Sequence, residues 1–206
     1  MKKLLTTSMV LLTFSVIGQK ASAQDSVDSG GLFLEPAVTY EMGKGEMDFG
    51  AAGKPDGDLE GFGVGLRFGG HVSDIFFLAL DANYSEPEFT DENGDFDYDL
   101  KSWTAGLTVG LQTPVVGLRV WGGYIPFGEI ELDGRGSNQS NVTYKDPDMW
   151  KLGAGFRVGI VSLNLEYLTG TYEKLNIRNA GPITGTYSQE ADRESWIASV
   201  SFPLAL

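Results

Sequence analysis

Arg193 to Leu206, the last fourteen residues, read RESWIASVSFPLAL, and this stretch indicates the fold of the whole chain. Taken two at a time, one set of its residues is apolar, while the alternate set is mostly small and polar. Residues two apart lie on the same face of a β-strand, so the stretch predicts a strand with one face in an apolar environment. The apolar set is Trp196, Ala198, Val200, Phe202, Leu204 and Leu206.

The opposite end of the chain has the pattern of an export signal. Lys2 and Lys3 precede an apolar run from Leu4 to Ile17, and Ala21–Ala23 offers small residues for cleavage. The run is shorter than the ~20 residues that a membrane-spanning helix needs. We therefore expect residues 1–23 to be a signal peptide and residues 24–206 to form one domain.

The composition excludes several classes of function. The formal net charge is −13, which argues against a nucleic-acid partner, because nucleic acids bind to clusters of Lys and Arg. There is no cysteine, so neither a disulfide framework nor a thiolate site is available. We expect no cofactor and no metal site, since the single histidine, His71, has no second histidine to share a metal with. We predict His71 to be a solvated turn residue.

Eight segments alternate apolar with small or polar residues over about the 9–11 residues that a tilted membrane strand needs. Short connections around residues 70–74, 113–114 and 159–160 alternate with longer polar segments. We predict an all-β chain, an eight-stranded antiparallel up-and-down transmembrane β-barrel, with short periplasmic turns and long exterior loops. The expected loops are Gly43–Asp58, Glu86–Asp97, Asp133–Asp148 and Thr171–Asp192.

An aromatic residue stands at the long-loop end of each apolar face. Aromatic rings with a polar edge favour the headgroup level of a membrane, so these residues predict a girdle around the barrel. The predicted upper girdle is Tyr40, Phe62, Tyr84, Trp103, Tyr124, Trp150, Tyr167 and Trp196.

The polar face decides between a membrane barrel and a soluble, ligand-binding barrel. A face in bulk water would be rich in Lys and Glu, whereas this face is mostly Gly, Ser and Thr, which suit a narrow interior. Its few charged residues, with Glu41 near the top, predict an internal ion-pair network. That network is either a structural plug or the lining of a narrow water-filled path. Its predicted members are Glu35, Arg67, Asp81, Arg119, Lys151, Arg157 and Glu166; the inner-face residues Phe33, Phe77, Trp121 and Ile197 would add an apolar stretch.

The alternation, girdle, loop asymmetry and closing strand together resemble the small eight-stranded outer-membrane barrels, such as the OmpA transmembrane domain, OmpX and OmpW. The resemblance implies the outer membrane of a Gram-negative bacterium, contact with its lipid and lipopolysaccharide, recognition of the C-terminal strand by the assembly machinery, and a monomer. It carries over no catalytic or binding motif, so we expect no catalytic residues.

Three functions remain open at this point. The first is a structural or surface-interaction protein with acidic exterior loops. The second is a narrow channel for ions or small, apolar solutes, and the third is a lipid-modifying enzyme. The enzyme is disfavoured because lipid-modifying barrels have their catalytic His and Ser at the outer rim, whereas His71 is expected at the short-turn rim. The seven acids between Glu86 and Asp99 leave a weak divalent-cation site as a further hypothesis.

Overall fold

The computed structural model describes residues 31–50, 53–73, 75–91, 97–113, 117–133, 141–178 and 184–206. The predicted signal peptide lies outside these residues, and so does Asp95 of the acidic segment. Within the described ranges, no helix is long and apolar enough to cross a membrane. The strands are β1 (Leu32–Met47), β2 (Asp56–His71), β3 (Phe76–Asp91), β4 (Asp97–Gln112), β5 (Leu118–Asp133), β6 (Asn141–Val158), β7 (Val161–Arg178), β8 (Gly185–Tyr187), β9 (Ala191–Ser201) and β10 (Leu204–Ala205).

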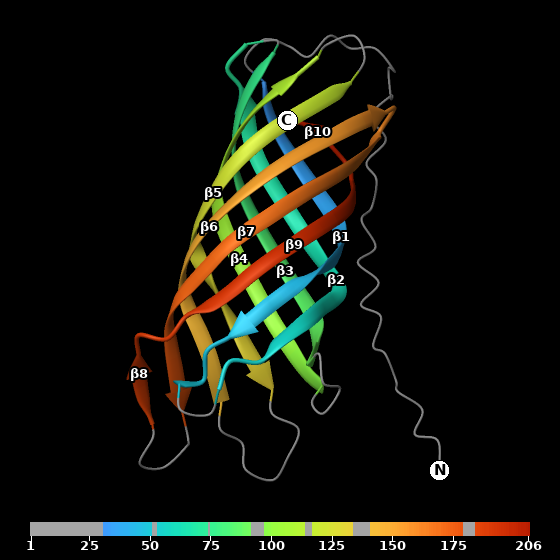
Figure 1. Ribbon diagram of the computed structural model, residues 1–206. Helices are drawn as coiled ribbons and strands as arrows, with labels where there is room; N and C mark the ends of the chain where they lie inside the picture. The colour runs from blue at the N-terminus through green and yellow to red at the C-terminus, as the bar shows by residue number, and fades with distance from the viewer. Residues whose placement is uncertain are drawn as a thin grey trace, which may run out of the picture.

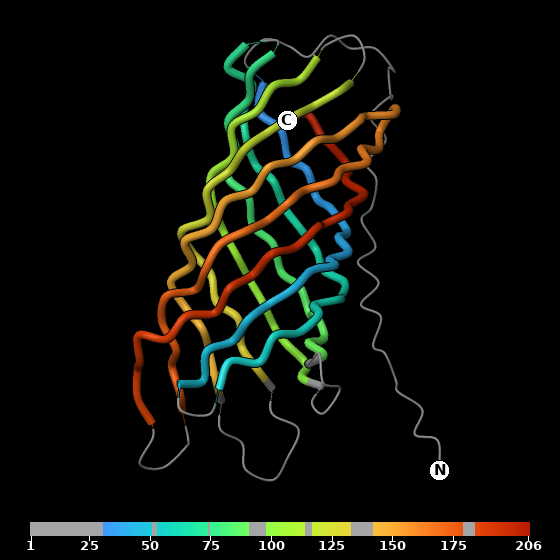
Figure 2. The backbone as a smooth tube through the Cα atoms, viewed as in Figure 1, coloured from blue at the N-terminus to red at the C-terminus, as the bar shows by residue number. Residues whose placement is uncertain are grey.

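The chain forms a closed antiparallel barrel of eight strands, as predicted (Figures 1 and 2). The short-turn end, called lower, is drawn at the top of both views, and the long-loop end, called upper, is drawn at the bottom. Strands β1 to β7 pair in sequence order, and β9 closes the barrel between β7 and β1. The predicted closing strand is interrupted after Ser201, and β10 resumes the pairing with β1. The short β8 pairs only with the end of β7, beyond the closed part of the barrel.

Strands β1 to β7 run farther than the sequence predicted, with 16 to 18 residues each. Much of the four expected loops is therefore strand, and the predicted strand ends were wrong. The reason is that the alternation continues past the girdle, but there the polar residues face outward and the apolar residues face inward. On β2, Phe62 faces outward below this point, whereas Glu60 and Asp58 face outward above it and Leu59 is buried.

The outer surface below the girdle is apolar, as a surface in contact with lipid must be. Large apolar side chains on this face are about half exposed, and they alternate with inward-facing small or polar residues. Examples from successive strands are Val38, Leu66, Leu80, Val109, Val120, Leu152, Leu163 and Val200.

Two apolar clusters fill the two ends of the interior. The lower cluster, near the short turns, contains Phe33, Phe77, Ala79 and Trp121. Apart from Ile197, which is one residue below Trp196 on β9, the upper cluster lies beyond the girdle row on every strand that contributes to it. Its members are Met47, Leu59, Phe89, Leu100, Ile125, Ile130, Leu132, Tyr144, Met149, Leu168, Tyr172, Leu175, Ala191 and Ile197.

Glycines make room for the large side chains of the lower cluster. A Cβ atom at Gly153 would collide with the Trp121 ring, and one at Gly110 would collide with the Phe77 ring. An eight-stranded barrel has an interior only wide enough for side chains, so each large ring needs such a gap opposite it. The alternation of Gly with large residues is therefore a packing requirement.

Candidate functional site

The interior charges lie in three groups between the two apolar clusters. We call them the lower pair (Glu35 and Arg119), the middle quartet (Arg67, Asp81, Lys151 and Glu166) and the upper pair (Glu41 and Arg193). Four acids face four bases, so the three groups together carry no formal net charge. Burying ions is favourable only where each has a partner and further hydrogen bonds, and every group meets this condition.

The lower pair joins β1 to β5 across the barrel. Arg119 donates from Nη1 to Glu35 Oε2 at 2.7 Å and from Nη2 to Glu35 Oε1 at 2.6 Å. Arg119 also donates to Asn164 Oδ1 at 3.1 Å, and the Ser201 hydroxyl donates to Glu35. The two parallel bonds are the geometry in which guanidinium binds carboxylate most strongly. Glu35 lies opposite Arg67 in the register of β1 and β2, but its carboxylate bonds to Arg119 instead.

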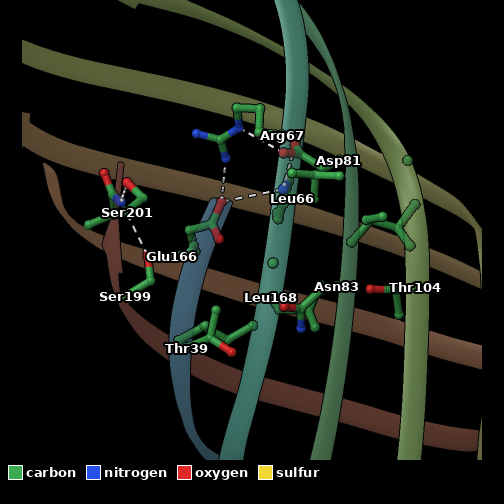
Figure 3. A pocket seen from close by; sticks show the side chains of 18 of the residues that line it. Thr39, Leu66, Arg67, Asp81, Asn83, Thr104, Glu166, Leu168, Ser199 and Ser201 are labelled. Atoms are coloured by element: carbon green, nitrogen blue, oxygen red, sulfur yellow. Dashed lines mark hydrogen bonds and ion pairs between the residues drawn. The ribbon is translucent and has the colours of Figure 1, made fainter. Parts of the chain in front are cut away.

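The middle quartet draws its side chains from four strands (Figure 3). Arg67 Nε donates to Asp81 Oδ1 at 2.7 Å, and Arg67 Nη2 donates to Glu166 Oε1 at 3.1 Å. Lys151 Nζ lies 2.7 Å from Asp81 and 3.3 Å from Glu166, which closes a ring of alternating charge. The Trp121 indole donates to Glu166 at 2.6 Å, and its ring lies 4.7 Å beneath the Arg67 guanidinium. A network this connected holds each side chain in one position.

The upper pair joins β1 to β9. Arg193 donates to Glu41 Oε1 from Nε at 2.8 Å and from Nη2 at 2.6 Å. Its Nη1 reaches Ser102 Oγ at 2.8 Å and the Tyr172 hydroxyl at 3.3 Å. Both ions are almost fully buried. The pair therefore connects the ionic interior to the upper apolar cluster, to which Tyr172 belongs.

Arg157 is the one predicted member that the structure leaves outside these groups. It lies on the inner face at the short-turn end of β6, and its Nε donates to the carbonyl oxygen of Gly159 at 3.0 Å. Among the described residues it forms no ion pair. Arg193 belongs to the network instead. The sequence prediction did not include it, although it is spaced by two and four residues from the inward-facing Ser195 and Ile197.

A cavity of about 60 Å³ lies between the middle quartet and the upper pair. A buried water needs roughly 10–15 Å³ of such space, so there is room for a few water molecules. Polar groups that face it include Thr39, Asn83 and Thr104 (Figure 3). Packed apolar residues stand toward both ends of the barrel from this chamber.

The eight predicted girdle residues all lie on the outer face and meet in four cross-strand pairs. Tyr40 with Phe62 and Tyr124 with Trp150 have ring centroids 4.8 Å apart, and Tyr167 with Trp196 have centroids 5.1 Å apart. Tyr84 lies opposite Trp103 in the register of β3 and β4. Exposure reaches 70% for Phe62 and 61% for Trp150, as expected for side chains surrounded by lipid.

A collar of carboxylates stands directly above the girdle and is hydrogen-bonded to it. The Tyr84 and Tyr167 hydroxyls donate to Glu86 and Glu194 at 2.7 Å, and the Tyr40 hydroxyl donates to Glu60. The fourth member, Glu129, is hydrogen-bonded to the Trp103 indole and lies 3.0 Å from the Lys145 ammonium. Asp148 accepts a hydrogen bond from Tyr124 and completes the acidic collar. The collar is Glu60, Glu86, Glu129, Asp148 and Glu194.

No family model matches the chain, and no curated protein does. Three solved structures are similar to it in fold. OprG from Pseudomonas aeruginosa is 12% identical, with 86% of this chain and 98% of that chain covered at a TM-score of 0.54. Ail of Yersinia pestis, in complex with the heparin analogue sucrose octasulfate, is 9% identical, with 85% and 99% covered at a TM-score of 0.52. AlkL in lipid bilayers is 15% identical, with 89% and 94% covered at a TM-score of 0.50.

Sequence identities this low show a shared fold and say nothing about ligands or activity. The chain has the fold of the small eight-stranded outer-membrane barrels. Its closed sheet and apolar belt suit a bilayer, in which every backbone polar group must be satisfied internally. Fold and belt together place the chain in the outer membrane of a Gram-negative bacterium.

Proposed function

We propose that this chain is a structural or surface-interaction barrel that presents a rigid acidic rim to the exterior and does not conduct through its interior. The observation that carries the proposal is the filled interior. Charge-balanced groups hold the middle, and apolar side chains pack toward both ends. An ion that entered would have to displace packed apolar side chains, at a cost that the narrow barrel does not offset.

Planar-bilayer recording tests this proposal. The purified barrel should leave the membrane silent, and Arg119→Ala should not create regular unitary events. A reproducible conductance in the parent protein that Arg119→Ala alters would refute the plug. It would favour the second candidate, a narrow path for ions or small apolar solutes, which the central cavity supports.

The charge of the outer rim defines the partners that it can accept. Outward-facing side chains above the girdle are mostly acidic on β2 and β3, where Asp56, Asp58, Glu60, Glu86 and Glu88 lie. Such a surface repels polyanions, so a sulfated sugar such as the heparin analogue sucrose octasulfate of the Ail complex is not a ligand proposed for this chain. A heparin column at low salt should not retain the folded protein, and salt-sensitive retention would contradict this assignment.

The remaining features of the proposal concern assembly and chemistry. The C-terminal strand would be read by the outer-membrane assembly machinery, the barrel would be a monomer in contact with lipid and lipopolysaccharide, and it would have no enzymatic activity. Truncation after Ser201 removes β10 and should lower the amount of heat-modifiable barrel in membranes. Expression should leave the lipid A mass spectrum unchanged, and a new lipid A species would revive the enzyme hypothesis.

A further inference from the structure

Aromatic side chains surround the only histidine of the chain at the short-turn end of the interior. The His71 ring centroid lies 5.1 Å from that of Phe33 and 6.3 Å from that of Phe77. The two Phe rings meet edge to face at 5.9 Å, and Trp121 belongs to the same cluster. We call Phe33, His71, Phe77 and Trp121 the aromatic seal. The expectation of a solvated turn residue is thus wrong, because His71 is half buried against rings.

The backbone holds His71 in this place from both neighbouring strands. His71 is the last residue of β2 and lies opposite Phe77 of β3 in the register. Its backbone N–H donates to the carbonyl oxygen of Gly31 at 3.0 Å, just before β1. Its ring is hydrogen-bonded to Gln112 of β4. The backbone of Gly31 is a second hydrogen-bond partner of the ring, and the aromatic neighbours Phe33 and Phe77 are apolar.

The charged groups that act on His71 are cations, like the protonated His71 ring itself. Arg119 of β5 and Arg157 of β6 both act on it as cations. The adjacent inward residues of β1, β3 and β4 are Phe33, Phe77 and Gln112, which carry no charge. Glu35 of β1 is already engaged by both terminal nitrogens of Arg119. Asp74 of the following turn lies outside the described residues.

Protonation would put a charge on a half-buried ring, and burial is the largest effect that opposes it. Glu35 neutralises Arg119, so the main opposing cation is Arg157, which even at a separation of about 10 Å and an effective dielectric of about 20 would oppose the imidazolium by roughly tenfold. Attraction to an aromatic face recovers only about two- to fivefold at a partly exposed site. The neutral ring is thus the form that the seal accepts, and the protonated ring is driven toward water.

We propose that His71 is a proton-operated latch: the neutral ring completes the aromatic seal, and protonation expels it and admits water to Trp121 and the lower pair. Histidine titrates near pH 6.5 when unperturbed and moves across the mildly acidic range with its surroundings. The seal would therefore respond to acid on the periplasmic side while the rest of the barrel stays folded.

Trp121 provides the reporter for this proposal. In a background with Trp103, Trp150 and Trp196 replaced by Phe, Trp121 is the only tryptophan left. Acrylamide quenching of its fluorescence is measured in detergent micelles from pH 8 to pH 5. We expect strong protection at pH 8 and a rise in quenching on acidification with a single midpoint. His71→Phe should abolish the rise, and His71→Arg should give the acid level of quenching at pH 8.

The controls separate the latch from general acid effects. Arg157→Gln removes one opposing cation outside the ionic groups, so the midpoint should move to higher pH. Carboxylate titration elsewhere would persist in His71→Phe, and an unchanged rise in that variant overturns the proposal. A flat profile in the parent, or full protection in His71→Arg, overturns it equally. Heat-modifiable mobility verifies folding, and if His71→Phe fails to fold, His71→Gln replaces it as a non-titrating side chain that can still bond Gln112.

Discussion

Replacing Arg193 by Met should destabilise the barrel by about 3–5 kcal/mol, because it leaves Glu41 charged and buried without its partner. The donor–acceptor distances of 2.6 and 2.8 Å put the two charge centres about 4 Å apart. At an effective dielectric of about 20, this attraction is worth about 4 kcal/mol. The hydroxyls of Ser85 and Ser195 remain beside Glu41 and cannot neutralise it.

The double variant separates charge from packing. Combining Arg193→Met with Glu41→Leu puts apolar side chains next to the upper apolar cluster, and replacing a buried pair in this way is often close to neutral. We expect each single variant to lose about 3–5 kcal/mol and the double variant to stay within about 2 kcal/mol of the parent. Urea titration of the barrel in lipid vesicles, followed by tryptophan fluorescence and heat-modifiable mobility, measures all four proteins. Single losses below about 1 kcal/mol, or a double loss equal to their sum, would refute the reasoning.

Four further outcomes are expected. Gly153→Leu should cost about 1–3 kcal/mol by driving a side chain into Trp121, whereas Ala154→Leu on the lipid face should be tolerated, as urea midpoints will show. Leu59→Asn should cost about 2–4 kcal/mol and Asp58→Asn almost nothing, and equal losses would contradict the reversed polarity above the girdle. Arg157→Gln should stay within about 0.5 kcal/mol, whereas Arg119→Gln should cost about 3–5 kcal/mol. Outside the membrane, the Gly50 N–H and the Lys54 ammonium lower the pKa of Asp48. The stabilising contribution of Asp48 is therefore complete above the unfolded-state pKa of about 3.9 and is lost as the pH falls through the folded-state pKa. A carboxyl NMR titration, with Lys54→Ala as the comparison, will detect this loss.

The sequence predicted the barrel because lipid imposes a pattern that is readable one strand at a time. Side chains such as Leu66 and Val64 must alternate with small inward residues, and the girdle aromatics recur at one height. Both constraints act locally on each strand. The strand count and the outer face therefore followed from the alternation.

The pairing of the charges was beyond this reasoning because it depends on which strands face each other across the barrel. Glu35 is level with Arg67 along neighbouring strands, yet a long guanidinium from β5 reaches it across the interior. Arg193 was overlooked although it begins the predicted closing strand, because it stands beyond the girdle residue Trp196. The loop boundaries failed for the same reason: above Phe62 the polar residues turn outward, which looks like the end of a strand when only the apolar face is followed.

The acidic collar also has a consequence for how the barrel reaches its final position. Each carboxylate of the collar starts on the periplasmic side and must pass the hydrocarbon layer before it stands above the girdle, a passage that costs several kcal/mol for an exposed ion. The same cost applies in reverse once Glu60 and Glu86 are outside. The collar would therefore oppose movement of the barrel through the bilayer in both directions: it would slow insertion, and afterwards it would hold the finished barrel in place.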